Sequence, residues 1–354
     1  MTELLAGTRK GLFVLEGEPG GTFEVSRRAF AGETVEYAMR DPRSGRVLAS
    51  VTSAFYGPKL WWTDDPAGDW EQASGVALPE GGGAALERIW VIAAGEADGV
   101  LYAGGDPGVL LESHDGGASW ELNRGLWEHP SRDHWQPGGA GLCLHSIVTW
   151  PGEPDRLAVA ISAAGMWLSD DRGATWRSGN EGLVAGYLPE DTPPDEIALC
   201  VHRVHRARTR PERLFLQFHG GVYRSDDAGE SWTDIGAGLP SDFAFPLAVD
   251  PADPDSAYVI PLTADTDRVT PDGRVRVYET RDAGASWTAR GDGLPQEHAY
   301  LTVLREAFAW AGEGERLELY FGATSGDLFG SADAGATWSA AATRLPPVLS
   351  VATG

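Results

Sequence analysis

Cysteine and long apolar runs are both scarce in this chain. Of its 354 residues only Cys143 and Cys200 are cysteine, too few for a disulfide framework. No stretch reaches the roughly 18 consecutive apolar residues of a membrane-spanning helix, and the first residues lack the basic start and apolar run of a secretion signal. These absences argue against a disulfide-stapled scaffold and predict a cytoplasmic protein that does not enter a membrane.

Positive charge is also in short supply. Lys10 and Lys59 are the two lysines, and 28 Lys and Arg residues face 52 Asp and Glu residues, for a formal net charge of -24. Nucleic acids and anionic membranes are bound through clustered Lys and Arg. The charge therefore argues strongly against both partners. We expect a small-molecule ligand, with a protein partner as the alternative.

Turn-forming residues and tryptophan are abundant by contrast. The 46 glycines and 23 prolines predict many turns, while 42% hydrophobic and 23% charged residues are typical of a globular chain. Fourteen tryptophans against three methionines indicate a repeated unit that carries tryptophan.

That unit is an eight-residue motif, S-x-D-x-G-x-[ST]-W, which we call the turn motif. Its five clear copies are SHDGGASW (113–120), SDDRGATW (169–176), SDDAGESW (225–232), TRDAGASW (280–287) and SADAGATW (331–338). A degenerate copy, TDDPAGDW, occupies 63–70. Repeats of this length are typical of propellers and solenoids.

The residue types in the motif suit a tight turn between two strands. Glycine adopts backbone conformations that side chains disfavour, and the aspartate can accept backbone N–H bonds inside the turn. The tryptophan buries a large surface that fixes the hairpin to its sheet. We therefore interpret these aspartates as structural rather than catalytic.

The motif resembles the Asp-box, or BNR, repeat of the sialidase-like β-propellers in the wider WD40/YVTN/BNR-like superfamily. That family includes sialidases, xyloglucanase-type glycoside hydrolases, sortilin-like receptors and photosystem assembly factors. The resemblance covers nearly the whole chain. It implies one four-stranded blade per repeat, with the box between the third and fourth strands on the face away from the active site.

Strand patterns give the expected number of blades. A four-strand pattern that begins with LHSIVTW (144–150) recurs five more times, at 34–72, 86–122, 197–234, 243–289 and 299–340. The N-terminus adds three strands and the C-terminus one spare strand, PVLSVATG. We predict an all-β fold, a single seven-bladed β-propeller over residues 1–354 whose first blade is closed by the C-terminal strand.

Histidines gather at one end of the predicted channel. Aligned repeats place His145, His202, Phe245 and Glu36 on one tier of the innermost strands, with His219 on a nearby turn. Three neutral imidazoles suit zinc, iron, copper or manganese with an open position for substrate, so a divalent transition metal is the candidate cofactor. Acid–base histidines and purely structural histidines are the alternatives. Two long inserts, 125–141 and 183–196, are expected to enter the same face.

Carboxylates offer a second chemistry. Glu36 and Glu87 are candidates for the acid and base or nucleophile of a glycoside hydrolase, which needs two carboxyl groups at a defined separation. Further polar and aromatic residues at the predicted mouth are candidates for substrate binding: Arg9, Lys10, Arg88, Tyr56, Asp133, His134, Phe245 and His298.

Three functional hypotheses follow. The first is a hydrolase or lyase that uses His145, His202 and His219 at the channel mouth to bind a metal or move protons. The second is a sialidase-like glycoside hydrolase. The third is a non-enzymatic scaffold for protein interactions.

Overall fold

The computed structural model describes residues 1–79, 84–188 and 199–354, and these residues form an all-β structure. Helix within the described ranges is limited to short segments: α1 (Arg124–Trp127), η1 (Arg132–His134), η2 (Pro271–Gly273) and η3 (Gly314–Arg316). None of these is long and apolar enough to cross a membrane.

Twenty strands form five antiparallel sheets of four strands each. In chain order the sheets are β4 (Thr34–Arg40), β5 (Val47–Ser53), β6 (Gly57–Thr63) and β7 (Glu71–Gln72); β8 (Arg88–Ala94), β9 (Leu101–Asp106), β10 (Val109–Ser113) and β11 (Glu121–Leu122); β12 (Cys143–Trp150), β13 (Glu153–Ser162), β14 (Gly165–Ser169) and β15 (Arg177–Ser178); β16 (Val201–Arg206), β17 (Leu214–Phe218), β18 (Gly221–Ser225) and β19 (Thr233–Asp234); β20 (Ala244–Val249), β21 (Ala257–Pro261), β22 (Val277–Thr280) and β23 (Thr288–Arg290).

The remaining strands join the two ends of the chain in one eight-stranded sheet. Its order is β27 (Ser339–Ala342), β26 (Leu328–Ser331), β25 (Glu318–Ala323), β24 (Val303–Ala311), β28 (Val348–Thr353), β1 (Thr2–Thr8), β2 (Gly11–Gly17) and β3 (Phe23–Ala29). Strand β28 pairs antiparallel with β1 from Leu4↔Thr353 to Thr8↔Val348, whereas it meets β24 at the single parallel pair Glu306↔Ser350.

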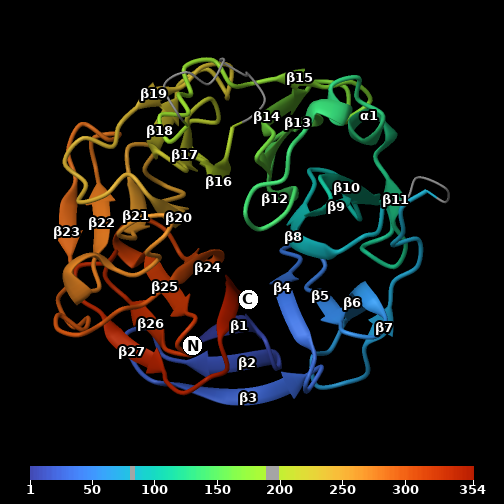
Figure 1. Cartoon of the computed structure of the whole chain (residues 1–354). Helices are drawn as coiled ribbons and strands as arrows, with labels where there is room; N and C mark the ends of the chain where they lie inside the picture. Colours follow the sequence, from blue (N-terminus) through green and yellow to red (C-terminus); the bar gives the residue numbers. More distant parts are fainter. Residues whose placement is uncertain (80–83, 189–198) are drawn as a thin grey trace.

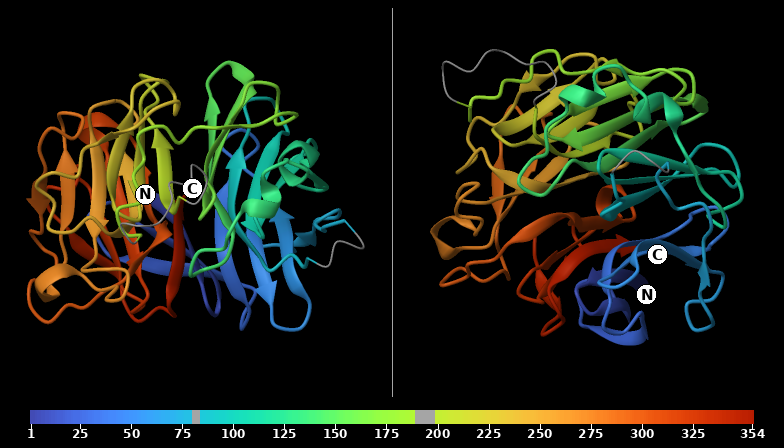
Figure 2. Two further views of the ribbon diagram at one scale, coloured as in Figure 1. Left: turned by 45° about the horizontal axis from the view of Figure 1, so that its top comes forward. Right: turned by 45° about the vertical axis from the view of Figure 1, so that its right-hand side comes forward.

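The sheets are arranged around a common axis. Figure 1 shows β4, β8, β12, β16, β20 and β24 nearest the centre and the short strands β7, β11, β15, β19, β23 and β27 at the rim. The N- and C-terminal ends lie close together in Figures 1 and 2, and Gly354 donates its N–H to the carbonyl of Glu3. Neighbouring sheets pack face to face through apolar side chains. In one such layer Trp150 and Ala158 meet Leu214, Leu216 and Trp232 of the next repeat.

In its five clear copies the turn motif closes the hairpin with the same hydrogen bonds of its first Ser or Thr and its Asp. In the copy at 169–176 the Ser169 hydroxyl donates to Asp171 Oδ1 at 2.8 Å and accepts the N–H of Gly173 at 2.8 Å. The Asp171 carboxylate accepts the N–H and the hydroxyl of Thr175, at 2.8 and 2.6 Å. The indole of Trp176 is buried and donates to the carbonyl of Gly173 at 2.9 Å. The side chains of Ser169, Asp171 and Trp176 therefore find their hydrogen-bond partners within the turn, and no ligand is needed to supply them.

An irregularity in strand pairing recurs at one level of the innermost strands. The register shifts occur between Val35 and Tyr37, Ile89 and Val91, Leu144 and Ser146, Val201 and Arg203, Ala244 and Leu247, and Val303 and Phe308. The residues skipped by the pairing include Glu36, His145, His202 and Phe245, the four that repeat alignment places on one tier. A β-bulge re-aims side chains locally, so this level of the sheets differs from regular pleated strands.

Candidate functional site

A cavity of about 270 Å3 lies where the starts of β16 and β20 meet the turns after β13 and β17. The insert at 125–141 forms part of its wall through Gln136, Gly138, Gly139 and Ala140. The remaining lining residues come from seven places in the chain: Ser162, Ala163, Tyr187, Leu188, Cys200, His202, His219, Phe243, Phe245, Arg268 and Arg305. The wall is therefore mostly apolar, with a few polar groups that converge on it, as is typical of small-molecule sites.

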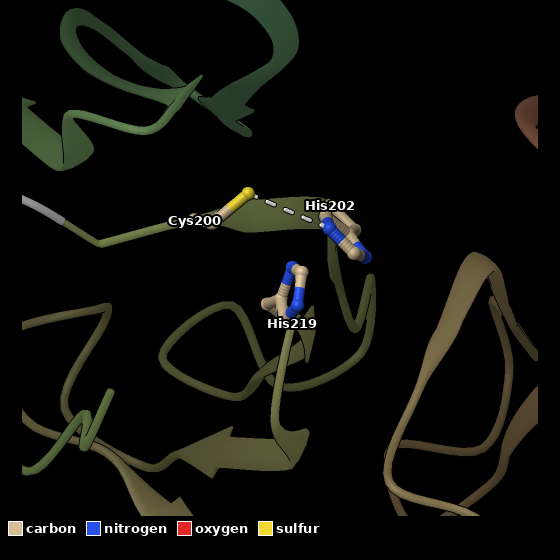
Figure 3. A group of neighbouring side chains, drawn as sticks. All are labelled: Cys200, His202 and His219. Atoms are coloured by element: carbon tan, nitrogen blue, oxygen red, sulfur yellow. Dashed lines mark hydrogen bonds between the residues drawn. The ribbon is translucent and has the colours of Figure 1, made fainter. Parts of the chain in front are cut away.

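Three potential metal ligands meet in this cavity. One ligand atom each from Cys200, His202 and His219 lies within 4.8 Å of the other two, and we call these residues the Cys-His-His cluster. Figure 3 shows Cys200 just before β16, His202 on that strand, and His219 facing both from the turn after β17. Cys200 Sγ is 3.5 Å from His202 Nε2.

Each imidazole of the cluster has a partner near its other nitrogen, a hydrogen-bonded carbonyl for His202 and a more distant carboxylate for His219. His202 Nδ1 donates to the carbonyl of Ala244 at 2.6 Å, which leaves the lone pair of Nε2 directed at Cys200. His219 Nε2 lies 3.6 Å from Asp265 Oδ2, so Nδ1 is the nitrogen available to a metal. Metal-binding histidines commonly hold a carbonyl or carboxylate in this way, because the partner fixes the tautomer and the ring orientation.

Burial sets the protonation state of the cluster. It lowers the pKa of His202 well below 6.5, with the Arg305 guanidinium as the next cause, and it lowers the pKa of His219 despite the opposing effect of Asp265. Burial also raises the pKa of the Cys200 thiol. At pH 7 the cluster therefore consists of two neutral imidazoles and a thiol, the forms from which a metal displaces one proton on binding.

His145, the third histidine expected at this site, neither joins the Cys-His-His cluster nor lines the cavity. Its side chain is completely buried, and its Nε2 donates to the carbonyl of Val201 at 2.9 Å while Nδ1 is 3.0 Å from the Ser146 hydroxyl. Both nitrogens are therefore engaged, and the Nε2 bond joins β12 to β16. The structure brings together His202 and His219 with Cys200, and His145 is not part of the group.

The other expected residues are scattered. Glu36 is 8% exposed and pairs with Arg88, whose Nε lies 3.2 Å from Glu36 Oε1, whereas Glu87 is exposed. Phe245 is buried in the cavity wall. The remaining candidates are exposed and are not among the residues that line the cavity: Arg9, Lys10, Tyr56, Asp133, His134 and His298.

One lining residue, Arg305, escaped prediction from the sequence, whereas Tyr187 was expected among the aromatic residues of the mouth. Arg305 lines the cavity from β24 and is 7% exposed, and its signal was the charged pair Arg305–Glu306 inside an apolar strand. Tyr187 lines the cavity from the insert at 183–196, and its hydroxyl accepts the N–H of Cys200 at 3.0 Å. Residues 189–196 of that insert lie outside the described residues.

Comparison with known proteins bears on the fold. No family model matches this chain, and no curated protein matches it in sequence. Among solved structures, an ancestral GH74 enzyme superposes with a TM-score of 0.58 at 15% identity, over 99% of this chain. The chain spans only 40% of that enzyme's length. YCF48 bound to D1 peptide gives a TM-score of 0.55 at 13% identity, over 92% of this chain and 84% of YCF48.

The fold is a β-propeller. YCF48 from Cyanidioschyzon merolae agrees, with a TM-score of 0.53 at 13% identity over 86% of this chain and 83% of that one. At such identities the likeness of this propeller to GH74 enzymes and YCF48 concerns the fold alone, because unrelated functions share such scaffolds. Function has to be argued from the site.

Proposed function

We propose that this propeller is an enzyme that binds a transition metal at the Cys-His-His cluster and uses it to hydrolyse a small molecule held in the adjacent cavity. The observation that carries the proposal is the convergence of Cys200, His202 and His219, each imidazole with a partner near its other nitrogen, beside a cavity of about 270 Å3. Three protein ligands with space for a fourth are typical of catalytic rather than structural metal sites.

The donor set indicates the metal. One thiol and two imidazoles suit zinc, copper or iron, whereas magnesium and calcium prefer oxygen ligands. A transition metal with an open position acts as a Lewis acid and activates water near neutral pH. The protein's part is to hold the rings in place through Ala244 and Asp265 and to enclose the substrate with the insert at 125–141.

The proposal extends to the number of blades. We infer that the eight-stranded sheet comprises two blades, β24–β27 and the group β28, β1, β2 and β3. The reason is that strand pairing between β28 and β24 is limited to one residue pair. With the five four-stranded sheets this gives seven blades in one domain over residues 1–354, closed by the C-terminal strand.

Elemental mass spectrometry of the purified protein tests the metal. We expect about one transition metal per chain, lost in Cys200→Ser and in His219→Ala. His145→Asn is the matched control and should retain the metal, because His145 lies outside the cluster. Absence of metal after reconstitution, or equal metal in His219→Ala, would contradict the proposal.

A second candidate is glycoside hydrolysis with Glu36 as the acid. Burial raises the pKa of Glu36 above its ordinary 4.5, in spite of Arg88, and a raised pKa is what a general acid requires. Turnover of aryl glycosides that survives chelation and disappears in Glu36→Gln would support this candidate. No turnover across a panel of glycosides would remove it.

A further inference from the structure

Arg305 is a buried cation without a counter-ion in the described part of the chain. Its side chain is 7% exposed, no described carboxylate lies within 4.0 Å of it, and its Nε has no hydrogen-bond partner. Its hydrogen bonding amounts to a long 3.5 Å contact from Nη2 to the Ser162 hydroxyl.

Arg203 shows how the same fold treats a buried arginine that serves the structure. It is also 7% exposed, but its Nη1 lies 3.2 Å from Glu306 Oε1 and 3.1 Å from the carbonyl of His145. Its Nε donates to His205 Nε2 at 3.0 Å. Arg203 is thus ion-paired and hydrogen-bonded through both Nη1 and Nε, whereas Arg305 has no ion pair among the described residues and one long hydrogen bond.

Burying an unpaired charge is strongly unfavourable, and a guanidinium cannot avoid that cost by losing its proton. Such a group is tolerated where something outside the chain supplies the opposite charge. Because Arg305 lines the cavity, the opposite charge would lie inside the cavity.

A second guanidinium faces the same place. Arg268 lines the cavity, and its Cζ lies 5.3 Å from the centroid of the Phe245 ring, while Arg305 Cζ lies 4.7 Å from that centroid. Arg268 Nε donates to the carbonyl of Asp265, and within the described ranges Arg268 forms no ion pair. The described lining contains two arginines and two histidines but no aspartate or glutamate, in a chain with a net charge of -24.

We propose that the cavity binds a small molecule through an oxyanion group, a carboxylate or a phosphate, which Arg305 and Arg268 hold beside the Cys-His-His cluster. Guanidinium groups present paired N–H donors that match the oxygens of both anions. The rings of Phe243 and Tyr187 provide apolar surface for the rest of the molecule. That this molecule is the substrate rests on the proposed function, whereas its binding does not depend on the metal.

The test is thermal unfolding of metal-free protein, dialysed free of chelator, in inorganic phosphate or malonate against chloride of equal ionic strength. We expect at least one of the two anions to raise the Tm of the wild type by about 2–4 °C at saturation. Arg305→Met should abolish that increase and, because it removes an unpaired charge, should not lower the Tm in chloride. The preferred anion identifies carboxylate or phosphate as the group recognised.

Arg203→Met is the matched control. It should lower the Tm in chloride, since it leaves Glu306 without its partner, yet preserve the increase caused by the anion. The proposal is overturned if neither anion raises the Tm, if Arg305→Met responds as the wild type does, or if Arg305→Met unfolds as readily as Arg203→Met.

The metal and the anion can fail separately. In His219→Ala, where the proposed metal site is lost, the anion should still raise the Tm if Arg305 and Arg268 bind it. A protein that binds no metal but responds to the anion would overturn the proposed function and leave the anion site standing. A protein that binds metal but whose Tm neither anion raises would overturn the anion site and leave the proposed function standing.

Discussion

His145 illustrates how one residue type takes two roles in neighbouring repeats. His145 and His202 occupy equivalent bulges on β12 and β16, yet His145 is held by Val201 and Ser146 while His202 faces Cys200. Burial lowers the pKa of His145 well below 6.5, and the nearby guanidinium of Arg305 lowers it further. His145 therefore stays neutral in the folded protein over the whole range in which a free histidine gains a proton.

This neutrality predicts a dependence of stability on pH. Below about pH 6.5 the unfolded chain binds a proton at His145 that the folded chain does not, so the stabilisation is complete above that pH and is lost as the pH falls. The free energy of unfolding should fall by up to about 1.4 kcal/mol per pH unit from this residue. Urea unfolding at pH 7.5, 6 and 5 gives the free energy of unfolding of the wild type and of His145→Gln. The difference between the two proteins should shrink as the pH falls. A difference that stays constant with pH would contradict the assignment.

Repeat alignment could place residues on a tier but not orient them. It brought Glu36, His145, His202 and Phe245 to one level, and all four lie at register shifts there. Which nitrogen of each ring faces the channel depends on the bulge and on partners from other repeats, such as the carbonyl of Ala244 for His202. Neither the bulge nor a partner from another repeat can be predicted from the hydrophobic pattern. The sequence therefore predicted His145 as the third member of the cluster, where the structure has Cys200.

Among the elements, the turn motif is the one whose stabilising hydrogen bonds could be predicted from its residue types. The pKa of Asp171 is lowered, chiefly by the hydrogen bond from the Thr175 hydroxyl, so its stabilising effect holds at neutral pH and is lost as the pH falls below about 4. The bonds it accepts tie the start of the hairpin to its end.

Asp171→Ala should lower the free energy of unfolding by about 1–3 kcal/mol, because the N–H and hydroxyl of Thr175 lose their acceptor. Asp170 provides the control: it is exposed and forms only surface ion pairs, so Asp170→Ala should change stability by less than about 1 kcal/mol. Denaturant midpoints measure both, and metal content should be unchanged in each. A loss of metal in Asp171→Ala would mean that the motif serves the site directly.

Strand positions were predicted more closely than the connections between them. The expected strand 144–150 is β12 (Cys143–Trp150). Apolar runs and turn residues carry that information locally. The insert at 125–141, by contrast, contains α1 and η1 and forms part of the cavity wall. Its course depends on distant partners, such as the Pro107 and Gly108 carbonyls bound by Arg132.

At the scale of the whole molecule, the pairing of β28 with β1 joins the two ends of the chain. Val348 and Val351 are buried in the layer that also holds Leu4 and Ala6. Removing residues 346–354 would expose this apolar layer and leave the edge of β1 unpaired.

We expect the truncated chain to lose more than about 3 kcal/mol of stability or to aggregate, since several buried side chains lose their partners. Differential scanning calorimetry of the two proteins compares their Tm, and a synthetic peptide of residues 346–354 should restore part of the loss. A truncated chain with the Tm of the full one would show that β28 is not needed for closure.

We propose above that the propeller holds a metal through one thiolate and two imidazoles. The absorption spectrum of the cobalt(II)-loaded protein tests it most directly, because a cobalt–thiolate bond gives a charge-transfer band in the near ultraviolet that imidazole and water do not. We predict that band in the wild type, its loss in Cys200→Ser, and its retention in His145→Asn. A wild-type spectrum without the band, or the same spectrum in wild type and Cys200→Ser, would contradict the account.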